Sequence, residues 1–390
     1  MKIAYVYHLD AANPAVQSGR PASILRSLAG AGATVIPVFP LKAKPSRGSS
    51  AWKALLRMLG RHYRGDRDPA YLVALGAEAA RRIEAEACDL VFCPGSEAIS
   101  RLNVEAPIVF CADATFANMV DYYWDFTGLS PGYLRKGHAQ ETSSLRRASL
   151  AVYPSEWAAR SAVDFYGANP AKVAVVPFGA NLGSENRRDE VEGWISARRA
   201  GRVRLLFVGR SWKRKGGEIV VDAARHLVQR GVHVQLDLVS GEAPRALASL
   251  PWVSMHGELD PNRPAARSLL GRLFREAHFV VVPSRAEAYG MTFAEAAAFG
   301  VPAIGTRTGG IPAVISDGVS GFTLPLAASG RDYAELISGV LGRREQYAQM
   351  CRSAFSEFER RLNWRAFSSR VLELAQRNFV GQPQEAGGHA

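Results

Sequence analysis

Short hydrophobic runs rich in β-branched residues alternate with amphipathic stretches along most of the chain. A run of this kind predicts a buried strand, and an amphipathic stretch predicts a helix that covers it. Repeated alternation favours parallel sheets with helices on both faces. In the first half we predict a helix over Pro21–Ala31 and strands over Lys2–Tyr7, Ala33–Phe39, Leu90–Cys93, Ile108–Cys111, Leu150–Tyr153 and Val173–Val176.

A polar stretch, Asn181–Gly201, interrupts this pattern and is interpreted as a linker. The alternation then restarts, which predicts a second α/β unit. Its predicted strands are Val203–Val208, His233–Val239, Val253–His256, Phe279–Val282 and Ala303–Gly305, and its predicted helices are Gly217–Arg230, Pro264–Glu276 and Thr292–Phe299.

Length and composition agree with two globular domains. The chain has 390 residues, of which 47% are hydrophobic and 22% charged, so wholesale disorder and collagen-like repetition are excluded. No apolar run reaches the roughly 18 residues of a membrane helix, and we expect no signal peptide. The four cysteines are sparse and form no CxxC pair, which disfavours a disulfide framework or a structural zinc site and favours the cytoplasm.

The net charge of +12 is concentrated near the start of the chain, because residues 1–67 hold eleven Lys or Arg and only two Asp or Glu. Residues 51–64 predict a basic amphipathic helix with opposite apolar and cationic faces. Such a helix fits an anionic membrane surface, but it equally fits packing against the first sheet, and both readings stay open. The apolar face holds Trp52, Leu55, Leu56, Leu59 and Tyr63, and the cationic face holds Lys53, Arg57, Arg61 and Arg64.

The densest chemical signal lies between Phe279 and Phe322. A strand ends near Pro283, Glu287 falls in the following loop, and Gly290 opens a helix that carries Glu295. The free amides and positive dipole of a helix N-terminus suit an anion such as a diphosphate. The two carboxylates can accept hydrogen bonds from sugar and ribose hydroxyls.

A second signal is the loop Gly209–Gly217, which follows a predicted strand and presents Arg210 and Lys215. Fixed cations stabilise the charge that develops on a leaving diphosphate. The chain has only eight lysines against forty arginines, so two lysines within this loop are unlikely to arise from composition alone.

These motifs, in this order, resemble the retaining glycosyltransferases of family 4. The matching features are the E-x7-E pair Glu287 and Glu295, the G-R-x4-K-G stretch from Gly209, a G-x-P and a Gly-Gly pair, and D-G-x-x-G from Asp317. The resemblance runs from about Val173 to Phe322 and extends weakly to Asn363 and Trp364.

The resemblance implies a GT-B fold, an α/β architecture with two Rossmann-like domains whose parallel sheets face a central cleft. Residues 1–180 would form the acceptor-side domain and 181–363 the nucleotide-sugar domain. Residues 364–380 would form a helix returning to the first domain, and 381–390 would be a disordered tail.

It also implies roles for individual residues. Arg210 and Lys215 would hold the donor diphosphate, and Glu287 would contact the sugar hydroxyls. The amides near Gly290, Met291 and Thr292 would face the diphosphate and sugar, and Glu295 would bind the ribose. The leaving phosphate would help to deprotonate the acceptor, so no protein nucleophile, cofactor or metal is expected.

The first half matches the family less well. A single Gly19 stands where relatives often carry a Gly-Gly pair, and we expect it beside the diphosphate with Arg20 as an additional cation. No histidine ends the strand Ile108–Cys111; Asp113 is the nearest polar residue, and we assign it to the acceptor side, with a helix N-cap as the alternative. Asp66 and Asp68 form a DxD pattern that we interpret as a chance match.

The expected activity is transfer of a hexose-type sugar from a nucleotide sugar to a glycan, lipid-linked or small-molecule acceptor. The expected location in the cell is the cytoplasm, and residues 51–64 could hold the protein at the inner face of the membrane. Two alternatives stay open: a nucleotide-sugar epimerase or phosphorylase of the same fold, and a non-catalytic basic module for membrane or nucleic acid. We favour no nucleic-acid partner, because the basic charge is confined to one segment.

Overall fold

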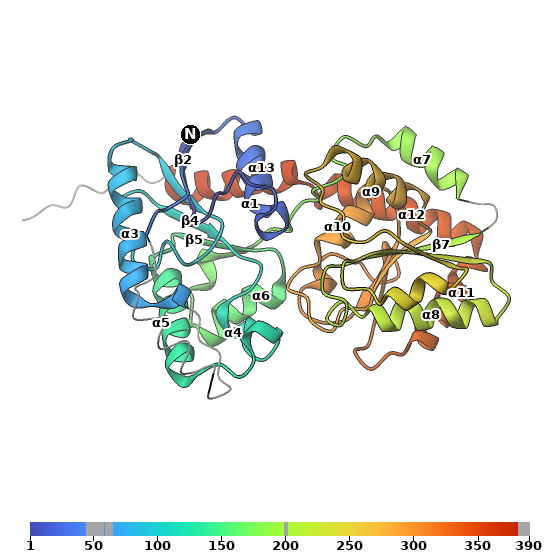
Figure 1. Cartoon of the computed structure of the whole chain (residues 1–390). Helices are drawn as coiled ribbons and strands as arrows, with labels where there is room; N and C mark the ends of the chain where they lie inside the picture. The colour runs from blue at the N-terminus through green and yellow to red at the C-terminus, as the bar shows by residue number, and fades with distance from the viewer. Residues whose placement is uncertain (44–57, 59–64, 199–201, 381–390) are drawn as a thin grey trace, which may run out of the picture. The chain divides into compact units, whose positions relative to one another are not determined.

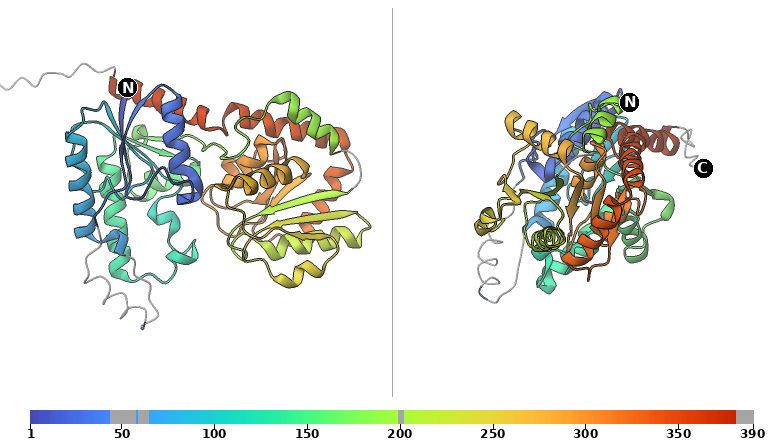
Figure 2. Two further views of the ribbon diagram at one scale, coloured as in Figure 1. Left: turned by 45° about the horizontal axis from the view of Figure 1, so that its top comes forward. Right: turned by 90° about the vertical axis from the view of Figure 1, so that its right-hand side faces the viewer.

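The computed structural model describes residues 1–43, 58, 65–198 and 202–380. The chain divides into two compact units, unit 1 (Met1–Val176 and Trp364 onward) and unit 2 (Pro177–Asn363). Each unit is built on one six-stranded sheet, and all recorded strand pairs are parallel. In each, helices lie on both faces of the sheet (Figures 1 and 2).

Unit 1 has the strand order β2-β1-β3-β4-β5-β6. The central strands are buried along their whole length, since β3, β4 and β5 each consist of four buried residues. Helices α1 and α13 pack against each other, so the last described helix completes this unit. Its elements are β1 Lys2–Val6, α1 Arg20–Gly30, β2 Thr34–Val38, α3 Pro69–Glu84, β3 Leu90–Cys93, β4 Ile108–Cys111, α4 Phe116–Met119, α5 Pro131–Arg147, β5 Leu150–Tyr153, α6 Glu156–Arg160, β6 Val173–Val175 and α13 Trp364–Ala375.

Unit 2 has the strand order β12-β11-β10-β7-β8-β9. Helices α8 and α11 pack together on one face, and α12 contacts α10 and α7 (Figure 1). Its elements are α7 Arg188–Ala197, β7 Val203–Val208, α8 Gly217–Gln229, β8 Val234–Val239, β9 Val253–Met255, α9 Pro264–Glu276, β10 Phe279–Val282, α10 Met291–Ala298, β11 Ala303–Thr306, β12 Gly321–Leu324, α11 Gly330–Leu341 and α12 Arg344–Arg360.

The interpretation of Asn181–Gly201 as a linker is wrong, because α7 occupies about half of it and packs into unit 2. The Glu190 side chain accepts a hydrogen bond from the Arg187 backbone at 3.0 Å and so caps the helix. Val191 and Ile195, one turn apart, are buried, and α7 packs on α12. Two apolar residues in a polar stretch were therefore enough to anchor a helix.

All four cysteines are free, as their spacing indicated. Three are buried and one, Cys88, is half-buried. Buried cysteine behaves as a small apolar residue.

His278 is a buried histidine directly before β10 that we expect to make unit 2 sensitive to acid. Its Nδ1 accepts from the Arg204 backbone N–H at 3.1 Å, so its Nε2 donates to the Arg198 carbonyl at 2.6 Å. Burial lowers the pKa of His278 from 6.5 to about 4. Between these values the unfolded chain takes up a proton that the folded protein does not, so the free energy of unfolding falls as the pH falls.

From pH 7 to pH 5 this histidine should remove about 2 kcal/mol of stability. Urea unfolding of wild type and His278→Gln at both pH values measures the effect, because the variant lacks the titrating ring. The wild type should lose more stability than the variant on acidification, and equal losses would contradict the assignment.

Candidate functional site

The strand order of unit 2 reverses between β7 and β10, which are neighbours in the sheet although β8 and β9 lie between them in sequence. Loop 209–216 follows β7 and loop 283–290 follows β10, both at the carboxyl ends of the strands. Open parallel sheets bind their ligands at this switch point. The two motifs found in the sequence therefore meet at the expected ligand position of this unit.

Glycines allow the segments at this edge to approach closely. Gly216 has a φ of +74°, and a Cβ there would lie 2.2 Å from the carbonyl oxygen of Pro283. At Gly310, the second residue of the Gly-Gly pair, a Cβ would lie 2.0 Å from the carbonyl oxygen of Ala288. Neither position has room for a side chain, so both glycines are needed for this backbone packing.

Lys215 and Glu287 form an ion pair at the centre of this edge. The Lys215 ammonium donates to Glu287 Oε2, and each side chain is only 11% exposed. Arg214 Nη1 lies 3.5 Å from the same carboxylate oxygen and donates to the Ala286 carbonyl at 2.8 Å. Arg214 was not predicted from the sequence. Its position next to Lys215, in a loop rich in cations, was the signal that could have identified it.

Carboxylates from the two neighbouring strand ends hold the rest of loop 209–216. Arg210 Nε lies 3.0 Å from Glu258 Oε1, and both side chains are more than half exposed. Glu242 accepts from the Trp212 backbone N–H at 2.9 Å. Exposed pairs such as Arg210 with Glu258 contribute only about 0–1 kcal/mol, so Arg210 can exchange this partner for a ligand anion at little cost.

Helix α10 begins directly after the loop that carries Glu287 (Figure 1). Gly290 is its N-cap residue, with a φ of +98° that favours glycine. Met291 and Thr292 form the first turn, where backbone N–H groups have no acceptor within the helix. The helix therefore presents donors and a positive dipole end at the switch point.

Glu295 lies in the second turn of α10 and is half-buried. Burial raises the pKa of its carboxyl from 4.5 to about 7, against the opposing effect of Lys215 and Arg267. The carboxyl group therefore exchanges its proton near neutral pH. The electrostatic effect of Lys215 shows that it belongs to the same cluster.

The structure thus gathers seven of the predicted residues on one unit. The set lies on two loops and one helix end of unit 2, and comprises Arg210, Lys215, Glu287, Gly290, Met291, Thr292 and Glu295. Gly19 and Asp113 lie in unit 1.

Gly19 is the N-cap residue of α1, with a φ of +79°. Two non-glycine residues before it, Gln17 and Ser18, also have positive φ, at 46° and 55°. Three consecutive left-handed residues are energetically unfavourable, and such strain is concentrated at functional sites.

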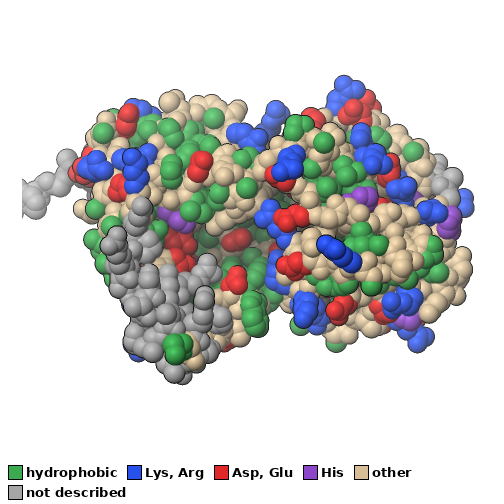
Figure 3. Space-filling model, in the orientation of Figure 1, with side chains coloured by type: hydrophobic (Ala, Val, Ile, Leu, Met, Phe, Trp, Pro, Cys, Tyr) green, Lys and Arg blue, Asp and Glu red, His purple; other side chains and the backbone are tan. Residues whose placement is uncertain are grey.

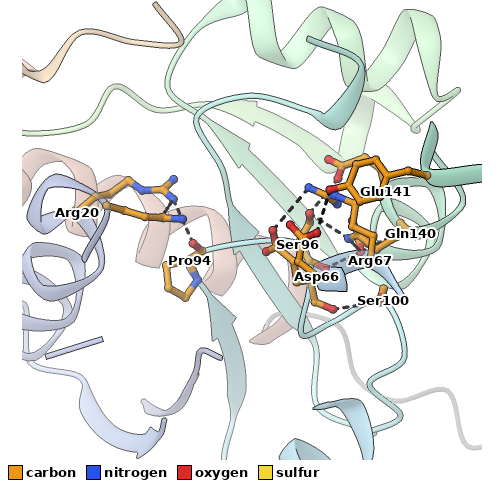
Figure 4. Close-up of polar contacts among 12 residues, drawn as sticks. Arg20, Asp66, Arg67, Pro94, Ser96, Ser100, Gln140 and Glu141 are labelled. Carbon is orange, nitrogen blue, oxygen red and sulfur yellow. Dashed lines mark hydrogen bonds and ion pairs between the residues drawn. The ribbon is translucent and has the colours of Figure 1, made fainter. Parts of the chain in front are cut away.

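Asp113 follows β4 and is half-buried. It does not cap the next helix, because the N-cap residue of α4 is Thr115. Burial alone would lower the pKa of the Arg20 guanidinium, but the Asp113 carboxylate raises it. Arg20 itself is buried and donates to the Pro94 carbonyl at 3.3 Å (Figure 4).

The DxD pattern has structural partners in unit 1. Asp66 Oδ1 accepts from the Tyr133 hydroxyl at 2.9 Å. Asp68 caps α3 through the Ala70 N–H and pairs with Lys136 at 3.4 Å. In the described ranges there is no cluster of three or more His, Cys, Asp or Glu suited to a metal ion.

The predicted basic helix at 51–64 lies outside the described residues except for Met58. None of the helices that the structure does describe is long and apolar enough to span a membrane. On the face shown in Figure 3, the Lys and Arg side chains of described residues are scattered among acidic ones and form no single stripe.

Comparison with known families first defines the class. Residues 202–342 match the family model of group 1 glycosyl transferases, so this segment of unit 2 is similar to a group 1 glycosyl transferase domain. The resemblance inferred from the Glu287–Glu295 and Gly209–Gly216 motifs is thereby confirmed.

Individual relatives agree with this class. A D-inositol 3-phosphate glycosyltransferase of Geodermatophilus obscurus is 36% identical over 205 residues, which cover 48% of this chain and 44% of the relative. A protein of the same name from Segniliparus rotundus is 31% identical over 53% of this chain and 47% of its own length. The chain spans about half the length of the curated relatives it matches.

Solved structures show that the fold is GT-B. A sucrose-phosphate synthase from Thermosynechococcus elongatus has a TM-score of 0.69 at 17% identity and covers 98% of this chain and 100% of its own. Anabaena Alr3699/HepE, solved in complex with UDP and glucose, has a TM-score of 0.64 at 17% identity, with 97% and 100% covered. The predicted fold class, two Rossmann-like parallel sheets, is confirmed.

Proposed function

We propose that this protein is a retaining, metal-independent glycosyltransferase that moves a hexose-type sugar from a nucleotide sugar to a glycan, lipid-linked or small-molecule acceptor. The observation that carries the proposal is the meeting of loop 209–216 with the glycine-capped start of α10 at the switch point of unit 2. Two cations and a helix N-terminus at one sheet edge suit a diphosphate.

The chemistry follows from charge development. When the bond between the sugar and the diphosphate breaks, negative charge accumulates on the leaving phosphate oxygens. Lys215 and the first amides of α10 would stabilise that charge without moving, which is the most effective form of electrostatic catalysis, and Arg210 would add to them once it has exchanged Glu258 for the diphosphate. The acceptor hydroxyl would attack the anomeric carbon from the side that the diphosphate leaves, and a leaving phosphate oxygen would take its proton. The acceptor oxygen is thus the nucleophile, and the protein need not supply one.

The carboxylates would orient the donor. Glu287, held by Lys215 and Arg214, would accept hydrogen bonds from the sugar hydroxyls, and Glu295 would accept them from the ribose. Orientation of this kind lowers the barrier by fixing the reacting atoms in advance.

The names of similar proteins support the same classes of substrate. HepE binds UDP and glucose, which supports a nucleotide-sugar donor. The curated relatives are named for D-inositol 3-phosphate, which supports an acceptor that carries several hydroxyl groups.

A thermal-shift screen with UDP, GDP, ADP and TDP, each with and without EDTA, tests this proposal. One nucleotide should raise the melting temperature equally in both conditions, because ligand at 100 times its dissociation constant adds about 2.7 kcal/mol of stability. A shift that EDTA abolishes would contradict metal independence. The absence of any shift would contradict the donor site itself.

The proposed location is the cytoplasm, with peripheral attachment to an anionic membrane through residues 51–64. Co-sedimentation with anionic vesicles tests the attachment. Neutralising Lys53, Arg57 and Arg61 together should release the protein from the vesicles, and unchanged sedimentation would favour the packing alternative.

A further inference from the structure

A buried polar cluster occupies the switch point of unit 1, where the order of its sheet reverses between β1 and β3. Its members come from segments far apart in the sequence: the turn 65–67, the loop after β3, and α5 (Figure 4). None was assigned a function from the sequence. The central residues are Arg67, Ser96, Glu97, Gln140 and Glu141.

Arg67 is the buried cation of this cluster. The residue is 7% exposed, and its guanidinium lies 4.7 Å from the centre of the Phe116 ring. Its Nη2 lies 3.7 Å from Glu97 Oε1, while Nε and Nη1 have no hydrogen-bond partner within the described ranges. A buried guanidinium is costly unless it is paired, so Glu97 is its necessary counter-ion.

Glu97 differs from its partner in exposure. Its side chain is 23% exposed, against 8% for Arg67, so Glu97 is the member of the pair that is open to solvent in part. Burial would raise the pKa of Glu97, but Arg67 and His8 hold it below its ordinary value. The cluster therefore presents a charged, positioned carboxylate at the ligand-binding edge of the sheet.

The groups around this pair bond to one another, but several of their buried atoms lack a hydrogen-bond partner among the described residues. Ser96 Oγ donates to Glu141 Oε2 at 2.9 Å and accepts from Gln140 Nε2 at 3.1 Å. Gln140 Oε1 and Glu141 Oε1, the other oxygen of that carboxyl, have no hydrogen-bond partner among the residues the structure describes, and the same holds for several other buried atoms of unit 1. Buried polar groups in folded proteins are almost always satisfied by protein, water or ligand. In the described part of unit 1, the buried atoms without a hydrogen-bond partner include Tyr7 Oη, His8 Nδ1, Arg67 Nε and Nη1, Gln140 Oε1, Glu141 Oε1 and Tyr153 Oη.

The charges of the cluster select the kind of ligand. Arg67 is matched by Glu97, and Arg20 interacts with Asp113. Burial raises the pKa of Glu141 to about 7, so this carboxyl adds little negative charge below neutral pH. An anionic ligand would find no cation here that lacks a carboxylate partner. Hydroxyl groups, in contrast, can donate to Glu97 and accept from neighbouring donors.

We propose that Glu97, positioned by the buried Arg67, is the carboxylate through which unit 1 binds the hydroxyl groups of an uncharged polyol ring. The identification of this ring as the acceptor of sugar transfer rests on the proposed function. The existence of the binding site does not rest on that function, because the site is inferred from contacts within unit 1 alone. Two adjacent hydroxyls of such a ring can donate to the two carboxylate oxygens, and Arg67 fixes their direction.

Ligand-observed saturation-transfer NMR tests the proposal. The probes are glucose, mannose, N-acetylglucosamine and myo-inositol, each beside a phosphate ester, added to the full-length protein. At least one uncharged probe should bind the wild type. Glu97→Gln should weaken that binding about tenfold or more, since a hydrogen bond to a charged group is lost. Glu84→Gln, an exposed glutamate at the end of α3, should leave it unchanged.

Binding that persists in Glu97→Gln, or binding of phosphorylated probes only, would overturn the proposal, as would binding of no probe. Glu97→Gln leaves Arg67 without its counter-ion. If that variant fails to fold, the double variant Arg67→Met with Glu97→Gln, which also removes the buried charge, takes the place of the single variant in the test. Nucleotide binding is measured in the same samples. Its failure would contradict the donor site in unit 2 and leave the result for Glu97 intact.

Discussion

Replacing Lys215 by alanine should lower turnover on the order of 100–1000-fold, the usual effect of removing one preorganised group that stabilises a developing negative charge. Lys215 is held at the carboxyl end of β10 by Glu287, so its ammonium does not have to reorganise during the reaction. The loss should appear mainly in kcat, because the charge on the leaving phosphate grows in the transition state.

Lys213→Ala is the matched control, since Lys213 lies in the same loop and is exposed. It should retain nearly full activity. Circular dichroism and the melting temperature must show that Lys215→Ala is folded, because its loss leaves Glu287 with Arg214 as the remaining cation. A folded Lys215→Ala protein with wild-type turnover would remove Lys215 from the diphosphate site.

The affinity for the nucleotide-sugar donor should rise about tenfold between pH 6 and pH 8. The pKa of Glu295 is raised to about 7, so its carboxyl is mostly protonated at pH 6 and mostly ionised at pH 8. Only the ionised form accepts two ribose hydroxyls, and therefore binding strengthens as the proton is lost. The intact nucleotide sugar is the right probe, because its diphosphate has no terminal group that titrates in this range.

Glu295→Gln should bind the donor more weakly at pH 8 and should lose the pH dependence. Glu335→Gln, an exposed glutamate on α11, should keep the wild-type profile. A donor affinity that is equally steep with pH in Glu295→Gln would show that another group titrates. Isothermal titration calorimetry at several pH values measures all three proteins.

The sequence predicted many of the strands, and it named the residues that meet at the switch point of unit 2, because both depend on local patterns. The strands Phe279–Val282 and Val203–Val208 are found with the predicted bounds, since short apolar runs with valine at their ends leave little choice. Gly216 and Gly290 have positive φ, and at Gly216 and Gly310 another backbone segment approaches too closely for a side chain. Glycine is visible in the sequence itself, so these positions could be recognised without the structure.

What the sequence did not predict depends on contacts between distant segments. The helix α7 owes its position to packing on α12. The pairing of Arg67 with Glu97 joins a turn to the end of a strand thirty residues away, and Glu141 lies on another helix. Single polar residues separated in this way form no pattern that spacing could reveal.

Hydrogen–deuterium exchange of the whole protein, with and without the stabilising nucleotide and in the presence of EDTA, tests the central claim most directly. If the donor binds at the switch point of unit 2, peptides covering 209–217 and 283–297 should gain the strongest protection. Protection confined to other segments, or none in these two, would contradict the assignment of the donor site.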